Sequence, residues 1–302
     1  MKLSVSTYSL LQWRTQQNKT FEDTIDWIAE SGVEAIEFSG MDEKAKNNPV
    51  KRAGQLRKHA EKRGLKVVSY CINAELLVPY QQQRAAIEQL KKQVDVAAEF
   101  GVPSMRHDVT RGIGEYSKGL KVKTYADVLK VIVPAIREVS DYAQSRGVKT
   151  TLENHGFYLQ NSKVVEKLLK TVAHKNFGLT MDMGNFLCVN DDPIAAVARL
   201  AKYAVMVHVK DFHVKEKSQS PGTGWFDTPT EIALRGAIAG HGVIDIPAQL
   251  RILKKSGYDG YLSLEFEGME EPTKAVSLGL EYLRGQLSAL EKSVKKAKPQ
   301  AA

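Results

Sequence analysis

Short apolar segments alternate with longer amphipathic segments along the whole 302-residue chain, and this alternation constrains the fold more than any other feature. The apolar segments predict strands at residues 2–6, 33–38, 66–71, 102–108, 148–152, 177–181, 204–207 and 261–264. The amphipathic segments predict helices at 21–30, 50–62, 82–100, 125–145, 162–173, 193–201, 247–256 and 273–290. Several strands are continuously apolar, which is typical of parallel strands buried on both faces. Eight strand–helix units over about 290 residues predict an α/β protein with a single (β/α)8 TIM barrel.

A doubly wound open sheet is the rival arrangement for alternating strands and helices. Its nucleotide-binding form carries a Gly-x-Gly-x-x-Gly turn after the first strand, and residues 7–13 hold no such turn. Glycines follow several predicted helices, as at Gly32, Gly64 and Gly101, which fits regular helix ends. The closed barrel is therefore the preferred prediction.

The chain is basic, with 43 Lys and Arg against 35 Asp and Glu, for a net charge of +8. Part of this excess lies at the end of the chain, at Lys292, Lys295, Lys296 and Lys298. A lysine cluster of this kind is typical of a solvated tail. We predict a catalytic barrel at 1–291 followed by a basic, disordered tail at 292–302. Nucleic acid is not an expected partner.

The expected compartment is the cytoplasm. Residues 1–7 lack the unbroken apolar run of a secretory signal, and no stretch approaches the ~18 uncharged apolar residues of a membrane span. Cys71 and Cys188 lie far apart in the chain and are predicted to be buried free thiols. No membrane partner is expected.

Potential metal ligands follow the last four predicted strands. Glu153, Asp182, His208 and Glu265 each lie at the carboxyl end of one strand. Any of these alone would be an ordinary loop or helix cap, but strand ends in a barrel converge on one mouth. Three acids placed together there need a cation among them. Carboxylates with one imidazole favour one divalent metal, Mn²⁺ first, with Mg²⁺ or Co²⁺ as alternatives, over a structural zinc.

Motifs around these strand ends extend over most of the chain. They are Ser4–Leu10, Leu152–Gly156, Met181–Asn185, His208–Asp211, Gly240–Asp245 and Gly257–Glu265. Together they resemble the xylose-isomerase-like superfamily of sugar isomerases and epimerases.

The resemblance implies a metal bound by Glu153, Asp182, His208 and Glu265. It also implies that Glu153 and Glu265 are catalytic and exchange a proton with a sugar or keto-sugar through a metal-stabilised enediolate. The expected activity is a metal-dependent isomerase or epimerase of carbohydrate metabolism. The alternative is a metal-dependent lyase or dehydratase on a keto-cyclitol or 3-keto-glycoside, and a sugar-binding barrel without activity is a third class.

Two positions depart from the superfamily's free-ketose 3-epimerases. Those enzymes carry an acid where this chain has Leu159 and a histidine where it has Asn185. Both residues normally touch the sugar, so the free-ketose 3-epimerase assignment is disfavoured. Asn185 also replaces a ligand that the related endonucleases use, which again argues against nucleic acid.

Six residues are predicted to bind a small carbohydrate substrate: Tyr8, His107, His155, Lys210, Trp225 and Arg235. His155 and Lys210 each follow a metal ligand by two positions, so strand alternation places them on its side. The alternative for Lys210 is an ion pair with Asp211 or Glu267. Residues 212–245 are too long for an ordinary loop, and we expect them to cover the mouth with Trp225 or Phe226 on a sugar face. The alternative for this segment is a homo-oligomer contact.

Overall fold

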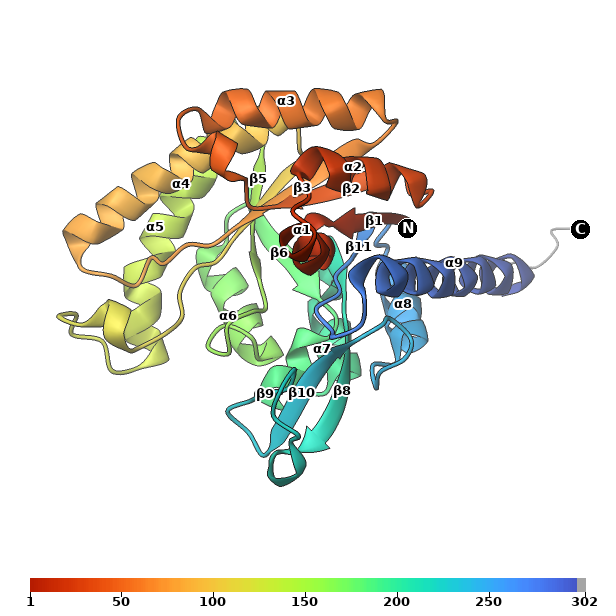
Figure 1. Cartoon of the computed structure of the whole chain (residues 1–302). Helices are drawn as coiled ribbons and strands as arrows, with labels where there is room; N and C mark the ends of the chain where they lie inside the picture. Colours follow the sequence, from red (N-terminus) through yellow and green to blue (C-terminus); the bar gives the residue numbers. More distant parts are fainter. Residues whose placement is uncertain (298–302) are drawn as a thin grey trace, which may run out of the picture.

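Eight parallel strands close into a barrel in the computed structural model, which describes residues 1–297 and side chains as far as Ser293 (Figure 1). In chain order the barrel strands are β1 (Lys2–Ser6), β2 (Ala35–Ser39), β3 (Lys66–Ile72), β4 (Ser104–His107), β5 (Lys149–Glu153), β6 (Phe177–Asp182), β7 (Ala204–Val209) and β11 (Tyr261–Leu264). Strand β11 pairs with both β7 and β1, which closes the barrel. The predicted fold class is confirmed.

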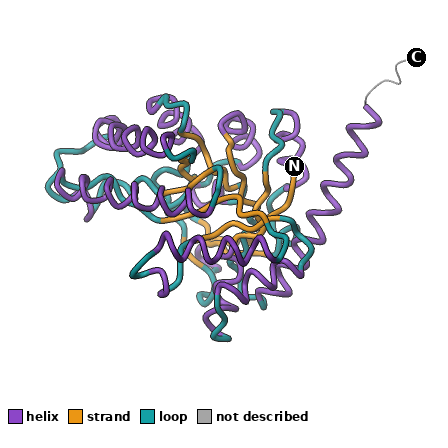
Figure 2. The backbone as a smooth tube through the Cα atoms, turned by 90° about the horizontal axis from the view of Figure 1, so that it is seen from above, coloured by secondary structure: helices purple, strands orange, loops and turns teal. Residues whose placement is uncertain are grey.

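Helices surround this barrel, as the view from above shows (Figure 2). They are α2 (Phe21–Glu30), α3 (Pro49–Lys62), α4 (Tyr80–Phe100), α5 (Tyr125–Ser145), α6 (Ser162–Val172), α7 (Pro193–Leu200), α8 (Ile246–Lys255) and α9 (Pro272–Ala297), with a short α1 (Leu11–Gln16) in the first loop. Their ends follow local chemistry. The Thr20 hydroxyl accepts from the amide of Asp23, whose carboxylate accepts from the amide of Thr20, a reciprocal cap of α2. Gly101 ends α4 with a φ of 71°, a conformation that glycine adopts without strain.

Helix α9 is longer than predicted. It continues through the proposed boundary at residue 291 and reaches Ala297, so residues 292–297 are helical. The remaining part of the predicted tail, residues 298–302, lies outside the described residues.

An insertion between β7 and α8 forms a small sheet of its own. Strands β8 (Asp211–Glu216), β9 (Phe226–Asp227) and β10 (Ile232–Ala237) pair antiparallel in the order β8-β10-β9 and project from the barrel (Figure 1). The predicted long loop is therefore an ordered structure.

The two ends of this insertion are joined by one buried carboxylate. Asp211 accepts hydrogen bonds from the backbone amides of Gly240 and Gly242, each at 2.9 Å, and of Ile244 at 3.1 Å. A Cβ on Gly242 would lie 2.2 Å from the Asp211 Oδ1, so glycine alone fits there. This Asp211 clamp fixes where the small sheet leaves and rejoins the barrel.

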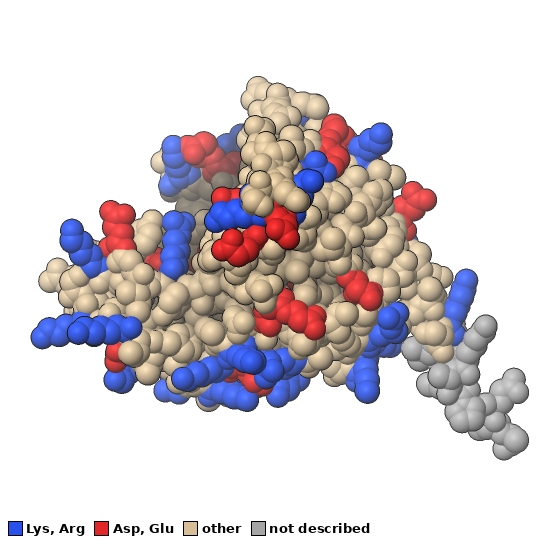
Figure 3. Space-filling view, turned by 90° about the horizontal axis from the view of Figure 1, so that it is seen from below, with Lys and Arg blue, Asp and Glu red and all other residues tan. Residues whose placement is uncertain are grey.

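On the face seen in Figure 3, basic and acidic side chains lie interspersed among neutral ones. Within residues 1–297, every helix is too short or too polar to cross a bilayer. Cys71 and Cys188 are free and buried.

An ion-pair network joins α2, α3 and the loop after β2, and it predicts a pH-dependent stability. The buried Arg52 guanidinium lies 2.7 Å from Glu22 and 2.5 Å from Asp42. Its hydrogen bonds lower the pKa of Glu22 from 4.5 to about 2. A carboxylate with a lowered pKa stabilises the fold above pH 4.5, and that contribution is lost as the pH falls towards 2.

Replacing Arg52 by methionine should lower the free energy of unfolding at pH 7 by about 1–2 kcal/mol, discounted because Glu22 is partly exposed. The difference from wild type should shrink between about pH 5 and pH 2, measured by urea unfolding. Arg57→Met is the matched control, because Arg57 meets its carboxylates only at 3.6 and 3.9 Å. A difference that stays constant with pH would contradict the assignment.

Candidate metal centre

The four predicted ligands meet at one point of the barrel mouth. Glu153 and Asp182 end β5 and β6, His208 lies near the end of β7, and Glu265 directly follows β11. One ligand atom from each lies within 4.8 Å of the others, and all four side chains are buried. The strand register pairs Asp182 of β6 with His208 of β7, so these two predicted ligands lie side by side at adjacent strand ends.

Asp182 tests whether these residues suit a cation. Its Oδ1 accepts from the backbone amides of Gly184 at 2.8 Å and Asn185 at 2.9 Å. Its Oδ2 is buried and has no hydrogen-bond partner among the described residues, although the Lys210 ammonium lies 3.4 Å away. A buried carboxylate oxygen without a donor is costly, and a cation would satisfy it. The buried Glu, Asp and His cluster therefore indicates a divalent-metal site.

Glu37 orients the imidazole of His208 from below the site. The Nε2 of His208 lies 3.0 Å from the Glu37 Oε1, and Ser263 donates to the same carboxylate at 3.1 Å. Burial disfavours the charged form of Glu37, but His208 lowers its pKa below the usual value. The other ring nitrogen, Nδ1, then faces Glu153 at 3.3 Å and Glu265 at 3.5 Å. A carboxylate behind a ligand histidine is the usual way of fixing its tautomer.

Arg106 has a similar role for Glu153. Its guanidinium lies 2.6 Å from the Glu153 Oε2 and 3.2 Å from Asp108. Burial raises the pKa of Glu153, but Arg106 and then His208 outweigh it and hold the pKa well below 4.5. Arg106 is not among the residues predicted from the sequence to form the site. Side chains alternate between the two faces of β4, and this alternation turns Arg106 inward beside Glu153.

The same alternation places the side chain of His107, the next residue, away from the barrel mouth. His107 is fully buried, its Nδ1 donates to the Asp108 carbonyl at 2.9 Å, and its ring lies 6.3 Å from that of Phe177. It lines none of the cavities described below. The structure therefore does not bring His107 to the site where it was predicted to bind substrate.

Lys210 lies among carboxylates beside the four predicted metal ligands. Its ammonium is 3.1 Å from Glu265 and 3.7 Å from Glu267, so one of the predicted alternatives, the Glu267 ion pair, is present. Burial disfavours the ammonium, but Glu267 and Asp182 raise its pKa well above 10.5. The Tyr8 hydroxyl donates to Glu267 at 3.2 Å, and burial and then Glu267 raise the pKa of Tyr8 to about 12. A cation and a hydroxyl thus stand at one side of the ligand cluster.

Two neighbouring cavities, which share lining residues, open over this cluster. The metal-site cavity, of about 240 Å³, is lined by Tyr8, Ser39, Cys71, Asn73, Arg106, Glu153, His155, His208, Lys210, Glu265 and Glu267. The outer cavity, of about 340 Å³, is lined by Tyr8, Gln12, His155, Gly156, Phe157, Gln160, Asn185, Cys188, Lys210, Gly224, Phe226, Gly236 and Glu267. Tyr8, His155 and Lys210, three of the predicted substrate-binding residues, line both.

Trp225 and Arg235 lie outside both cavities. The guanidinium of Arg235 stacks 5.8 Å from the Trp225 ring and donates to Glu270 at 3.1 Å. Phe226, the neighbour of Trp225, lines the outer cavity instead. The small sheet therefore does reach the mouth, through Phe226.

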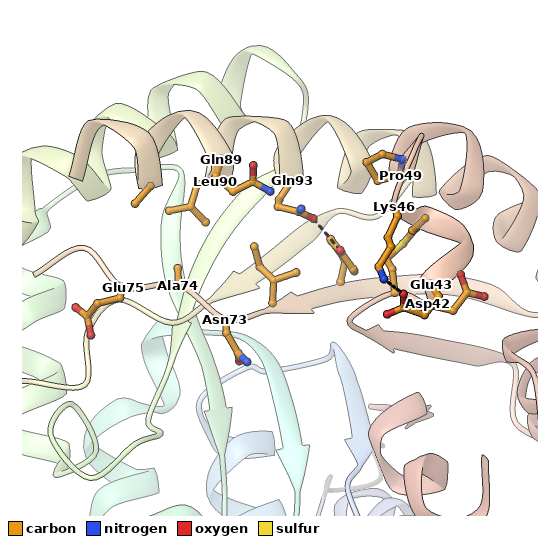
Figure 4. Close-up of a pocket in the computed structure, with 15 residues that line it drawn as sticks. Asp42, Glu43, Lys46, Pro49, Asn73, Ala74, Glu75, Gln89, Leu90 and Gln93 are labelled. Atoms are coloured by element: carbon orange, nitrogen blue, oxygen red, sulfur yellow. Dashed lines mark hydrogen bonds and ion pairs between the residues drawn. The ribbon is translucent and has the colours of Figure 1, made fainter. Parts of the chain in front are cut away.

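A larger groove, of about 490 Å³, lies between α4 and the loop that precedes α3 (Figure 4). Gln89 and Gln93 reach it from α4, and Gln93 accepts a hydrogen bond from Tyr70 at 2.8 Å. None of the four predicted metal ligands lines this groove, which shares only Asn73 with the metal-site cavity. The predicted ligands therefore lie outside this groove.

Known proteins resemble the chain over part or most of its length. Residues 25–286 match the xylose isomerase-like TIM barrel family. The rhizopine catabolism protein MocC of Rhizobium meliloti is 30% identical over 145 residues, 46% of this chain and 43% of that protein. An inosose dehydratase of Clostridium beijerinckii is 22% identical over 262 residues, 83% of each chain.

Among solved structures, an L-ribulose 3-epimerase superposes with a TM-score of 0.76 at 16% identity, covering 100% of this chain and 99% of that one. At this identity the superposition shows the fold alone. The match to the family model covers most of the barrel, including all four residues of the ligand cluster. The chain belongs to the xylose isomerase-like TIM barrel family, as a sugar-active enzyme with a buried metal site.

Proposed function

We propose that this protein is a divalent-metal-dependent isomerase or epimerase that moves a proton at the carbon next to the ketone of a sugar or keto-sugar. One observation carries the proposal. The carboxylates of Glu153 and Glu265 approach the same His208 nitrogen, at 3.3 and 3.5 Å, inside one buried cavity. A divalent cation held by these residues and Asp182, for which Mn²⁺ suits the donor set best, would polarise the ketone and its neighbouring hydroxyl and acidify the C–H bond between them.

The side chains supply the proton transfers. One carboxylate removes the proton as general base, and the other returns a proton to the opposite face of the carbon. Arg106 keeps Glu153 in place, while Glu265 faces the Lys210 ammonium at 3.1 Å. The Lys210 charge would also stabilise the negative charge that develops on the substrate oxygen.

Dehydration is the second candidate, and two observations favour it. The inosose dehydratase resemblance spans most of both chains. The Tyr8–Glu267–Lys210 cluster also stands beside the ligands, where it can give a proton to a departing hydroxyl. In this reaction the C–H and C–O bonds break, a C=C bond forms, and water leaves. Both candidates share the first proton abstraction.

Mass spectrometry in D₂O tests both candidates. The protein is loaded with Mn²⁺ and incubated with a panel of ketoses and keto-cyclitols. Gain of deuterium with unchanged composition supports the isomerase or epimerase, and loss of water supports the dehydratase. Protein treated with a chelator is the control. Absence of both products with Mn²⁺, Mg²⁺ and Co²⁺ would overturn the proposal.

A further inference from the structure

The side chain of Asn154 makes two hydrogen bonds to the backbone of a single residue, Asp182. Its Oδ1 accepts from the Asp182 amide and its Nδ2 donates to the Asp182 carbonyl, each at 2.9 Å. Both residues are fully buried. One primary amide thus gives Asp182 the acceptor and the donor that the backbone of a neighbouring strand would otherwise supply.

This contact completes a strand pairing that stops too early. The pairing of β5 with β6 ends at Glu153, whose partner lies two residues before Asp182. The other ligand-bearing strands pair further along. Asp182 lies opposite His208 across β6 and β7, and the amide of Glu265 donates to a β7 carbonyl at 3.0 Å. Asn154, the first residue after β5, therefore supplies the contact that the β5 backbone does not reach.

The direction of the Asp182 carboxylate is set by its own turn. The hydrogen bonds to its Oδ1 come from the amides of Gly184 and Asn185, at 2.8 and 2.9 Å. These bonds move together with the turn, so the place of the buried Oδ2, which suits a cation, depends on where the Asp182 backbone is held. On the β5 side, Asn154 holds it.

Asn185 makes a second link between the same two strand ends. Its Nδ2 donates to the Glu153 Oε1 at 3.3 Å, and its backbone amide donates to Asp182. This side-chain bond is longer than either bond of Asn154, and Arg106 already holds Glu153 at 2.6 Å. Asn154 is therefore the stronger of the two links.

We propose that Asn154 is a positioning residue, which fixes the spacing of Glu153 and Asp182 and thereby the affinity of this centre for a divalent cation. The inference rests on the metal site of the proposed function, whichever reaction follows. Asn154 lines none of the cavities described above, so it does not touch a substrate bound there. Ionised aspartate would lack the donor, leucine lacks both groups, and glutamine is one methylene longer.

Replacing Asn154 by leucine nearly keeps its size and removes both hydrogen bonds. The dissociation constant for Mn²⁺, measured by calorimetry on the full chain, should rise about 10–100-fold, the usual effect of losing a residue that orients metal ligands. The electron paramagnetic resonance spectrum of bound Mn²⁺ should change as well, because it reports the symmetry of the ligands. Asn154→Ser is the second variant, since its hydroxyl is too short to reach both backbone groups, and it tests the same loss if the leucine variant does not fold.

Asn176→Leu is the matched control, because Asn176 joins the opposite ends of the same two strands. Its Nδ2 donates to the Val148 carbonyl, directly before β5, at 2.8 Å and to the Ser140 carbonyl of α5 at 3.0 Å. Both leucine variants should lower the melting temperature of the chelator-treated protein, since each leaves backbone groups unpaired. The control should keep the wild-type affinity for Mn²⁺ and the wild-type spectrum.

The outcomes separate this role from a general loss of stability and from the reaction. A wild-type Mn²⁺ affinity in a folded Asn154 variant, or an equal loss in Asn176→Leu, would overturn the inference and leave the proposed function standing. Weakened binding in the Asn154 variants alone, without exchange on any ketone by the wild type, would overturn the proposed reaction and leave the role of Asn154 standing. Absence of Mn²⁺ binding by the wild type would overturn both.

Discussion

Replacing Glu265 by glutamine should slow deuterium exchange into the substrate by about 10²–10⁴-fold, the usual contribution of a general acid–base group. Glutamine keeps the size of the side chain but cannot accept and return a proton. The variant should stay folded, because glutamine has nearly the same size as glutamate. The side chain of Glu265 also lies at the cavity surface, where it is 7% exposed. Exchange is measured by NMR in D₂O with Mn²⁺ at saturating concentration, and metal content by elemental analysis.

Two companion variants make this result interpretable. Glu153→Gln should also abolish exchange, because it removes the other carboxylate of the pair. Glu270→Gln is the matched control: Glu270 pairs with Arg235 at 3.1 Å outside both cavities, and its exchange rate should equal that of wild type. Turnover retained in Glu265→Gln with bound metal would remove Glu265 from the proton transfer.

Removing divalent metal should abolish activity and lower the melting temperature. Without a divalent cation, three buried carboxylates lie close together, and the Asp182 Oδ2 accepts no hydrogen bond from the described residues. A cation at 100 times its dissociation constant stabilises the native state by about 2.7 kcal/mol. Thermal unfolding is followed with chelator and then with Mn²⁺, Mg²⁺ or Co²⁺ restored at constant ionic strength. We expect the largest upward shift with Mn²⁺.

Asp182→Asn should lose this metal-dependent shift, because the amide cannot replace the charged oxygen. Asp42→Asn should keep it, since Asp42 pairs with Arg52 away from the cluster. A melting temperature that ignores Mn²⁺ in the wild type, or an equal shift in Asp182→Asn, would refute the metal site.

The barrel and the cluster of predicted ligands could be expected from the sequence because both follow from the repeated strand–helix unit. Buried parallel strands leave continuous apolar segments, and barrel closure brings their carboxyl ends together whatever the loops do. Glu153, Asp182, His208 and Glu265 were therefore found by position alone. The role of Glu37 could not be predicted in this way, because its contact with His208 spans 171 residues and depends on which strands lie opposite across the barrel.

Other features depend on details that a sequence pattern does not contain. In a strand as short as β4, four residues do not reveal which side chains face inward, so His107 was chosen where Arg106 lies. The small sheet was missed because β8 is partly exposed and carries charged residues, and β9 has only two residues.

The Asp211 clamp also bears on how such enzymes diverge. The Asp211 carboxylate accepts hydrogen bonds from the amides of Gly240, Gly242 and Ile244. The insertion therefore leaves and rejoins the barrel at almost the same place. Residues between these points can lengthen, shorten or be exchanged for another module while the strands that carry the ligands keep their positions. Laboratory evolution of a new substrate selectivity can thus be confined to the insertion between β7 and α8, without changing the predicted ligands at the barrel mouth.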